Sequence, residues 1–136
     1  MKPTSIVARR MGAAAGVALA LIAAARTLAC AQSASEMPRG DPRHGGTVYQ
    51  ACMGCHSLDE DDVGPRHRGV VGRVAGTVPG YAYSPALKQS GLVWTPANLD
   101  RWLTGPQVLV PGSKMFFSLS NAKDREDVIA YLAQQR

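Results

Sequence analysis

The pentapeptide Cys52-Met53-Gly54-Cys55-His56 restricts what this chain can fold around more than any other feature of its sequence. Two thiols three positions apart, with an imidazole directly after the second, are typical of a covalent c-type haem attachment site. On one helical turn both sulfurs can bond the vinyl groups of a single porphyrin, and the next side chain is then held under the ring. The motif therefore predicts Cys52 and Cys55 as attachment residues and His56 as an iron ligand.

Two other kinds of site use a Cys-x-x-Cys pair, and the neighbouring sequence favours neither of them. A thioredoxin-like redox pair lies between a strand and a helix, whereas residues 45–51 before the motif look helical or mixed. A structural zinc site needs two more ligands at a matched spacing. The sequence holds three cysteines, and the third, Cys30, forms no second pair. Haem attachment is therefore the preferred interpretation.

Residues 1–31 are typical of a bacterial secretory signal. Basic residues precede an apolar stretch over residues 11–25, and the small residues Ala29-Cys30-Ala31 follow it, as at a signal cleavage site. A membrane-spanning helix needs about 20 apolar residues, so we expect cleavage after Ala31 rather than an uncleaved anchor. Lipid attachment at Cys30 is a third, less favoured outcome. Export of this kind predicts a periplasmic location.

Removal of residues 1–31 would leave a flexible polar leader over residues 32–40 and one domain over residues 41–136. The whole sequence carries 15 basic and 10 acidic side chains. Four of the basic residues and none of the acidic ones precede residue 32, so the remaining chain would be nearly neutral. That balance gives no support for nucleic-acid binding, and the remaining length suffices for one domain with one core.

Helix signals dominate the expected domain. A capping residue followed by proline, which is typical of a helix start, occurs three times, at residues 41–42, 84–85 and 95–96. We expect the first helix to reach about Met53, and a last helix to begin near Ser120 or Asn121, before apolar residues at helical spacing. The intervening stretches are rich in glycine and proline, especially residues 64–80 and 105–112. The sequence therefore predicts an all-α fold whose loops wrap a large rigid ligand.

The sixth position on the iron separates two kinds of chemistry, since an open position suits gas or peroxide binding and a filled one suits electron transfer. Met115 follows Pro111 and Gly112, which would fix a sharp loop able to present the thioether to the far face of the ring. Met53 lies inside the attachment turn and Met37 in the leader, so Met115 is the candidate sulfur ligand. The alternative is that Met115 is an ordinary core residue.

Several motifs beyond the pentapeptide follow one another in a recognisable order, namely Gly45-x-x-x-Tyr49, the proline loop from Gly64-Pro65 to Gly72-Arg73, Pro79-Gly80-Tyr81-x-Tyr83, Gly91-x-x-Trp94, the segment from Pro111 to Met115, and the segment from Asp127 to Leu132. Through these motifs the sequence resembles the class I cytochromes c, the electron carriers of mitochondria and bacteria. The resemblance implies a small class I cytochrome c fold, with three to five helices around one covalently attached haem c.

The resemblance also implies a role for each remaining candidate residue. The Pro65 carbonyl would accept a hydrogen bond from His56, and Arg73, Tyr83 and Trp94 would stabilise the haem propionates. Two further cofactor-binding residues are expected. Ser113 lies in the methionine loop, the segment from Pro111 to Met115, and Trp102 lies in the helix before it.

The sequence departs from the family pattern at three places. The loop between His56 and Gly64 is short, and we expect its acidic run, residues 59–62, to be solvated. His67 stands where the family usually has leucine, and we prefer a histidine packed on the His56 side to a spare iron ligand. Trp102 stands where the family usually has a tyrosine near the methionine sulfur, and an indole can only donate a hydrogen bond.

The implied function is that of a monomeric, periplasmic single-haem electron carrier, not an enzyme, with redox proteins as donor and acceptor. Two alternatives remain open: a haem enzyme or gas sensor with an open sixth position, and a haem subunit of a larger oxidoreductase complex. Membrane contact is expected only if the N-terminal segment is uncleaved or lipidated. Mitochondrial carriers of this family surround the haem edge with lysines. This chain has Lys114 at one of these rim positions but Gln107 and Ala51 at others, so we expect docking to redox partners to depend only modestly on salt.

Overall fold

The computed structural model describes residues 39–136. The secretory signal predicted over residues 1–31, and all but the end of the leader predicted over residues 32–40, lie outside the described residues. An isolated β-bridge joins Val74 to Val93, and no helix in the described part of the chain is long and apolar enough to cross a membrane. The all-α prediction is confirmed, because this part of the chain forms five helices: α2 (Pro42–Tyr49), α3 (Pro85–Gln89), α4 (Pro96–Thr104), α5 (Pro106–Leu109) and α6 (Ala122–Gln134).

Four of the helices begin where the sequence predicts. The side chains of Asp41, Ser84 and Thr95 each accept a hydrogen bond from a backbone N–H in the first turn, and proline follows each of them. Asn121 caps α6 by accepting from the N–H of Lys123. These caps satisfy first-turn donors that have no partner within the helix, so local sequence is enough to set the helix starts.

Two features differ from the expected helix spans. The helix α2 ends at Tyr49 rather than near Met53, because the N–H groups of residues 50–53 bond to carbonyls three residues back and form tighter turns. The helix α5 lies inside the stretch 105–112 that we expected to be a loop. It is a short turn whose N-cap, Gly105, has no side chain to signal a helix start.

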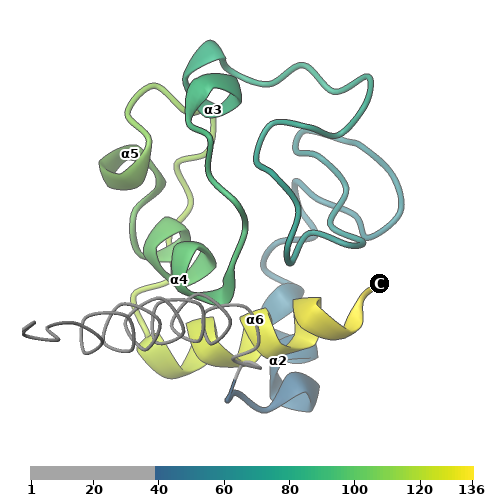
Figure 1. The fold of residues 1–136 in the computed structure, drawn as a ribbon. Helices are drawn as coiled ribbons and strands as arrows, with labels where there is room; N and C mark the ends of the chain where they lie inside the picture. Colours follow the sequence, from purple (N-terminus) through teal and green to yellow (C-terminus); the bar gives the residue numbers. More distant parts are fainter. Residues whose placement is uncertain (1–38) are drawn as a thin grey trace, which may run out of the picture. The chain divides into compact units, whose positions relative to one another are not determined.

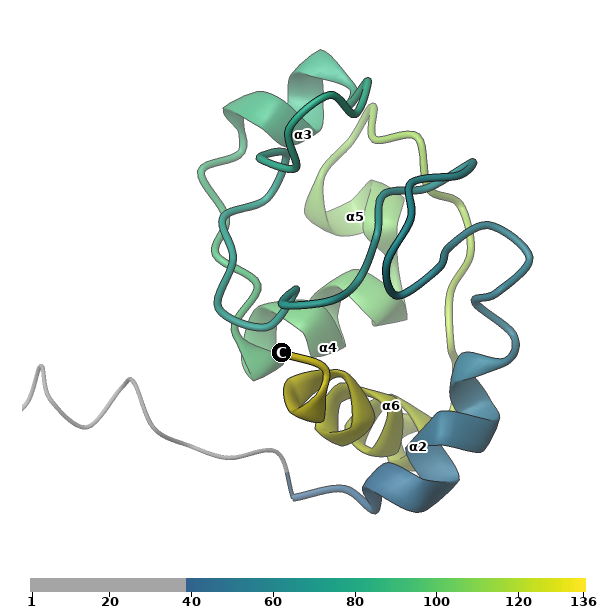
Figure 2. The same ribbon diagram turned by 90° about the vertical axis from the view of Figure 1, so that its right-hand side faces the viewer.

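The first and last helices, α2 and α6, pack against each other (Figures 1 and 2). Gly45 lies at their contact, where a Cβ atom would be only 1.9 Å from the carbonyl oxygen of Asp127. The backbones can therefore come this close only because the residue is glycine. The helix α4 contacts α6, and α5 contacts α4. The helix α6 contributes four buried apolar residues to the core: Val128, Ile129, Ala130 and Leu132.

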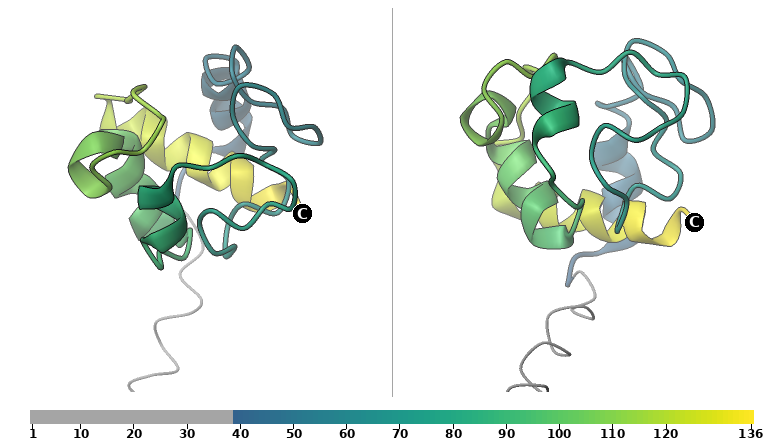
Figure 3. Two further views of the ribbon diagram at one scale, coloured as in Figure 1. Left: turned by 90° about the horizontal axis from the view of Figure 1, so that it is seen from above. Right: turned by 45° about the horizontal axis from the view of Figure 1, so that its top comes forward.

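The long segment between α2 and α3 lies on the opposite side from α4 and α5 (Figures 1 and 3). It is fixed by backbone bonds to the extended segment before α4. The Gly72 N–H donates to the Trp94 carbonyl and the Trp94 N–H donates to the Arg73 carbonyl, both over 2.9 Å. Two walls built from distant parts of the sequence thus face each other, and the candidate site lies between them.

Candidate haem-binding site

An open, mostly apolar cavity of about 260 Å³ lies between the helices and the long loop segment. Its wall draws on the chain from Ala51, just after α2, to Leu132 in α6. The structure brings nearly all of the predicted site residues together around this one cavity, namely Cys52, Cys55, His56, Pro65, Arg73, Tyr83, Trp94, Trp102 and Met115.

The two cysteines lie on one turn that directly follows α2. The N–H groups of Cys55 and His56 both donate to the Cys52 carbonyl, over 3.0 and 2.9 Å, so the turn holds both thiols and the imidazole together. Burial, reinforced by the neighbouring Cys55, raises the pKa of the Cys52 thiol to about 11. The motif follows a helix and not the strand that a thioredoxin-like pair requires.

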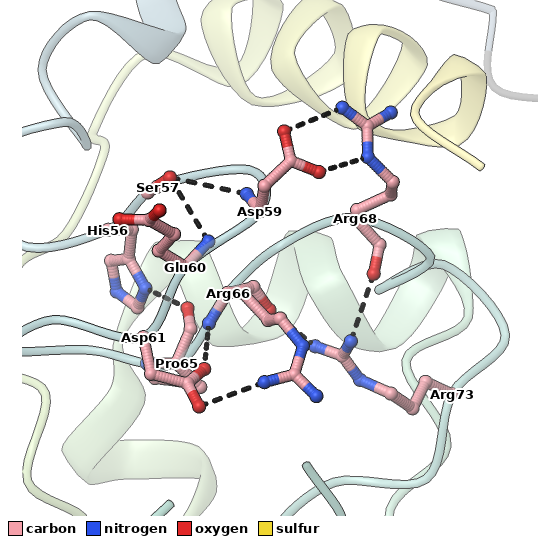
Figure 4. Close-up of polar contacts among 9 residues, drawn as sticks. All are labelled: His56, Ser57, Asp59, Glu60, Asp61, Pro65, Arg66, Arg68 and Arg73. Carbon is pink, nitrogen blue, oxygen red and sulfur yellow. Dashed lines mark hydrogen bonds and ion pairs between the residues drawn. The ribbon is translucent and has the colours of Figure 1, made fainter.

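The ring of His56 is fixed from two sides. Its Nδ1 donates to the Pro65 carbonyl oxygen over 2.8 Å (Figure 4). Gly64 lies against the ring, since a Cβ atom there would be 2.1 Å from Cε1 of His56. Burial lowers the pKa of His56, although the hydrogen bond to Pro65 opposes this. The imidazole is therefore neutral with its proton on Nδ1, which leaves the Nε2 lone pair available to a metal.

A second histidine lies next to this ring. His67 stacks on His56 with ring centroids 4.0 Å apart and planes inclined by 20°, and its Nδ1 lies 3.2 Å from the Tyr49 hydroxyl. Burial, followed by repulsion from His56 and Arg73, lowers the pKa of His67 to about 3. His67 is therefore a neutral, packed residue on the His56 side, as preferred from the sequence.

Met115 lines the same cavity and its sulfur has a hydrogen-bond donor. The indole Nε1–H of Trp102 donates to the Met115 Sδ over 3.2 Å. Trp102 is buried in α4 and packs edge-on against Trp94, with ring centroids 5.2 Å apart. The tyrosine that the family usually has at position 102 would offer a hydroxyl near the methionine sulfur. The Trp102 indole offers an N–H donor there instead.

Two arginines of the proline loop pair with the acidic run of residues 59–62, and a third, Arg73, bonds within the loop itself (Figure 4). Arg66 pairs with Asp61 and Arg68 pairs with Asp59, each with one N···O distance of 2.9 Å. Arg73 donates to the carbonyl oxygens of Arg66 and Arg68, over 2.9 and 3.1 Å. All four acidic residues of the run are exposed, as expected of a solvated loop, and ion pairs neutralise two of them, Asp59 and Asp61.

Donor groups gather on one part of the cavity wall. Arg73 and Tyr83 both line it, and burial raises the pKa of Tyr83 while the nearby Arg73 cation acts in the opposite direction. Trp94 is buried and lines the same cavity. A guanidinium, a phenol and an indole can all donate hydrogen bonds, so this part of the wall is suited to carboxylate groups.

Ser113 is the predicted site residue that the structure does not place among the lining residues. It is buried, and its Oγ accepts a hydrogen bond from Nε2 of Gln107 over 2.8 Å. The hydroxyl is thus turned toward α5, and a contact of Ser113 with the cofactor stays a prediction. Sequence reasoning treated Gln107 only as a rim position, because a single glutamine carries no signal of such contacts.

Comparison with known proteins identifies the family. The family model for cytochrome c matches residues 43–136. The chain belongs to the cytochrome c family. Over 107 residues it is 48% identical to cytochrome c2 of Rhodomicrobium vannielii, which covers 76% of this chain and 86% of that protein. It is 44% identical to cytochrome c2 of Rhodoblastus acidophilus, over 70% of this chain and 92% of that protein.

Solved structures of similar proteins share the fold of this cytochrome c. Cytochrome cH from Methylobacterium extorquens matches with a TM-score of 0.67 and 46% identity, over 69% of this chain and 98% of that one. Ferricytochrome c2 from Rhodopseudomonas palustris matches with the same TM-score and 39% identity, over 71% of this chain and 99% of that one. The class I cytochrome c fold predicted from the sequence is confirmed.

Membership of this family establishes that the protein is an electron carrier rather than an enzyme, and that it carries one covalently attached haem c. The residues of the described chain fit that group. Paired thiols and a neutral imidazole share one turn, glycine makes room beside the imidazole, and the remaining wall is largely apolar. The predictions of haem c and of electron transfer are therefore confirmed.

Proposed function

We propose that this cytochrome c is a periplasmic single-haem carrier whose iron is ligated by His56 and Met115. Cys52 and Cys55 would form the two thioether bonds. The observation that carries the proposal is that two preorganised candidate ligands line one cavity: His56, whose Nδ1–H donates to Pro65, and Met115, whose sulfur accepts a hydrogen bond from Trp102. When bound, the haem supplies a one-electron couple at its iron.

The chain's own residues would keep that couple ready for rapid transfer. Pro65 and Gly64 hold the His56 ring in one orientation, and Trp102 holds the Met115 sulfur. With both axial ligands held, little has to move when an electron enters or leaves. Ligation by methionine together with histidine raises the reduction potential, so we expect a positive value.

The donor groups on the cavity wall would stabilise the two propionates. Carboxylates buried without partners are costly, and Arg73, Tyr83 and Trp94 offer an N–H or O–H at the same wall. Of the three, Arg73 also keeps two hydrogen bonds to loop carbonyls. It can therefore hold the proline loop and a carboxylate at the same time.

The visible spectrum of the purified, exported protein tests the ligand assignment. We expect the weak red charge-transfer band of methionine-ligated ferric haem, a sharp α-band after reduction, and no change of the reduced spectrum with CO. The Met115→Ala variant should lose the charge-transfer band and bind CO. If the unmodified protein lacks the band and binds CO, Met115 is not a ligand and the sixth iron position is open to added molecules.

The periplasmic location and the monomeric state are tested on the same preparation. We expect the protein in the periplasmic fraction, with a mass that places its first residue at Gln32 and a sedimentation coefficient of a monomer. Retention of residues 1–31, or a lipid on Cys30, would instead show a membrane-held carrier. Stable co-purification with a dehydrogenase would favour the subunit alternative over a diffusing carrier.

A further inference from the structure

The loop that presents Met115 has little backbone support of its own. Pro111 and Gly112 form a tight turn in which the Ser113 N–H donates to the Val110 carbonyl over 3.1 Å. Gly112 has a φ of 84°, a conformation that favours glycine at this turn position. This bond closes the turn, but it does not fix the position of Met115, two residues further on.

The side chain of Gln107, in α5, spans this loop from end to end. Its Nε2 lies 2.8 Å from each of three acceptors: the carbonyl oxygen of Ser113, the hydroxyl of Ser113 and the carbonyl oxygen of Met115. Its Oε1 accepts from the N–H of Gly112 over 3.3 Å. One neutral side chain therefore contacts the turn, the buried serine and the backbone of the methionine itself.

The chemistry of these contacts requires an amide. Three oxygens surround one terminal atom of Gln107, so that atom must be the NH₂ group, and its two N–H bonds are shared among the three acceptors. The other terminal atom meets an N–H and must be the carbonyl oxygen. A carboxylate of the same shape would turn an oxygen toward three oxygens, and an aliphatic side chain would leave all four groups without this partner.

We propose that Gln107 is the positioning residue that keeps the Met115 loop closed on the sixth iron position. The proposal rests on the ligation of the iron by Met115. A thioether is a neutral ligand that other ligands can replace whenever its loop moves away. The four contacts of Gln107 break when the loop moves, so they lower the population of the open loop and slow ligand exchange.

The test measures how fast added imidazole replaces Met115 in the oxidised holoprotein, by following loss of the red charge-transfer band. Each lost hydrogen bond is worth roughly 1 kcal/mol net, so Gln107→Leu should accelerate exchange by about tenfold or more. Gln107→Glu should accelerate exchange at least as much, because it turns a carboxylate oxygen toward the carbonyl oxygens of Ser113 and Met115. Val108→Glu adds the same charge at the next residue, which is 89% exposed, and should leave the rate unchanged.

Hydrogen exchange of the Gly112 amide gives a second readout that does not depend on the iron. It should become faster in Gln107→Leu, which removes the acceptor of this N–H, and stay unchanged in Val108→Glu. Equal imidazole rates in all four proteins, with the band present, would overturn the role of Gln107 while leaving Met115 as ligand. Absence of the band in the unmodified protein would overturn the ligand assignment and the role of Gln107 with it.

Discussion

At the residue scale, the environment of the Met115 sulfur distinguishes this cytochrome c. The indole of Trp102 donates to it over 3.2 Å, and the direction of that bond is fixed because an indole nitrogen cannot accept. The partial positive charge of the N–H therefore always faces the sulfur. With Met115 as the proposed iron ligand, the positive end of this N–H dipole would stabilise the state of lower iron charge, which is the ferrous state.

Replacing Trp102 by phenylalanine should lower the reduction potential. A net loss of about 1 kcal/mol in favour of the ferrous state corresponds to about 40 mV for one electron, given about 59 mV per tenfold change. Potentiometric titration of the holoprotein measures the shift. Trp102→Tyr restores a donor and should recover most of the potential, whereas an equal shift in both variants would show that packing alone sets it.

Sequence reasoning succeeds for residues whose spacing reflects one local structure and fails for those whose role depends on distant contacts. Cys52, Cys55 and His56 share a single turn, so their spacing reports their geometry directly. The contacts of Gln107 exist only because the turn at Gly112 folds back toward α5, which composition does not reveal. The hydrogen bond from Trp102 to Met115 is of the same kind, since it joins a helix to a loop.

At the element scale, the packing of α2 against α6 rests on the absence of one side chain. Gly45→Ala would place a Cβ atom 1.9 Å from the Asp127 carbonyl oxygen, so one of the helices must shift. We expect a loss of about 1–3 kcal/mol in the free energy of unfolding, measured by denaturant titration of the holoprotein.

The neighbouring glycine gives a matched control for this change. A Cβ atom on Gly46 would lie 3.4 Å from the Tyr131 ring. This contact is close, but it is with a side chain, which can move more easily than the backbone that Gly45 faces. Gly46→Ala should be neutral or add about 0.5–1 kcal/mol, since alanine is favoured over glycine inside a helix. Similar losses in both variants would mean that helix propensity, not the close contact, governs this site.

The same helix pair contains a buried carboxylate that makes stability depend on pH. Asp127 accepts hydrogen bonds from the Lys123 ammonium, the Asp41 N–H and the His44 ring. The Lys123 bond, followed by those from Asp41 and His44, lowers the pKa of Asp127 to about 2, although its desolvation acts in the opposite direction. In the unfolded chain the pKa of an aspartate is about 3.9, so the folded state binds the proton less well.

The charge of Asp127 therefore stabilises the fold fully above about pH 4, and this contribution disappears as the pH falls toward 2. The difference in unfolding free energy between the unmodified protein and Asp127→Asn should be constant near neutral pH and shrink across that range. Denaturant titrations at several pH values measure it. Asp124→Asn on the same helix is the control, and a difference independent of pH would exclude this role for the charge.

The beginnings of these helices are more predictable than their ends. A cap and a proline at the start of α3 or α4 act locally, so the sequence shows them. The end of α2 depends on a change from regular helix to tighter turns before the attachment site, which no single residue marks. The helix α5 is too short to show a periodic pattern, and glycine and proline around it resemble those of a loop.

On the scale of the whole molecule, only one of the three expected rim positions, Lys114, carries a charge to guide a partner. Gln107 is engaged in the methionine loop, and the retained Lys114 donates to the Ala82 carbonyl. Apolar side chains are exposed nearby in sequence, with Phe116 79% and Val108 89% accessible. Neutral and apolar groups of this kind favour brief contacts that do not rely on long-range attraction.

Electron transfer to a redox partner should therefore respond weakly to salt. Raising the ionic strength from about 10 to 200 mM shortens the screening length several-fold, yet we expect less than about a threefold change in the second-order rate constant. Stopped-flow mixing with the partner measures this, and Lys114→Gln should have a similarly small effect. A steep decrease with salt would show that charged residues elsewhere dominate docking.

The partly buried Cys52 thiol is poorly suited to react once the chain has folded. A protonated thiol is a poor nucleophile, and a pKa of about 11 leaves Cys52 protonated at neutral pH once the cavity has formed. The cavity wall runs from Ala51 to Leu132, so the cavity is complete only when both ends of the domain have come together. Thioether formation is therefore favoured in a chain whose cavity has not yet closed around the pentapeptide.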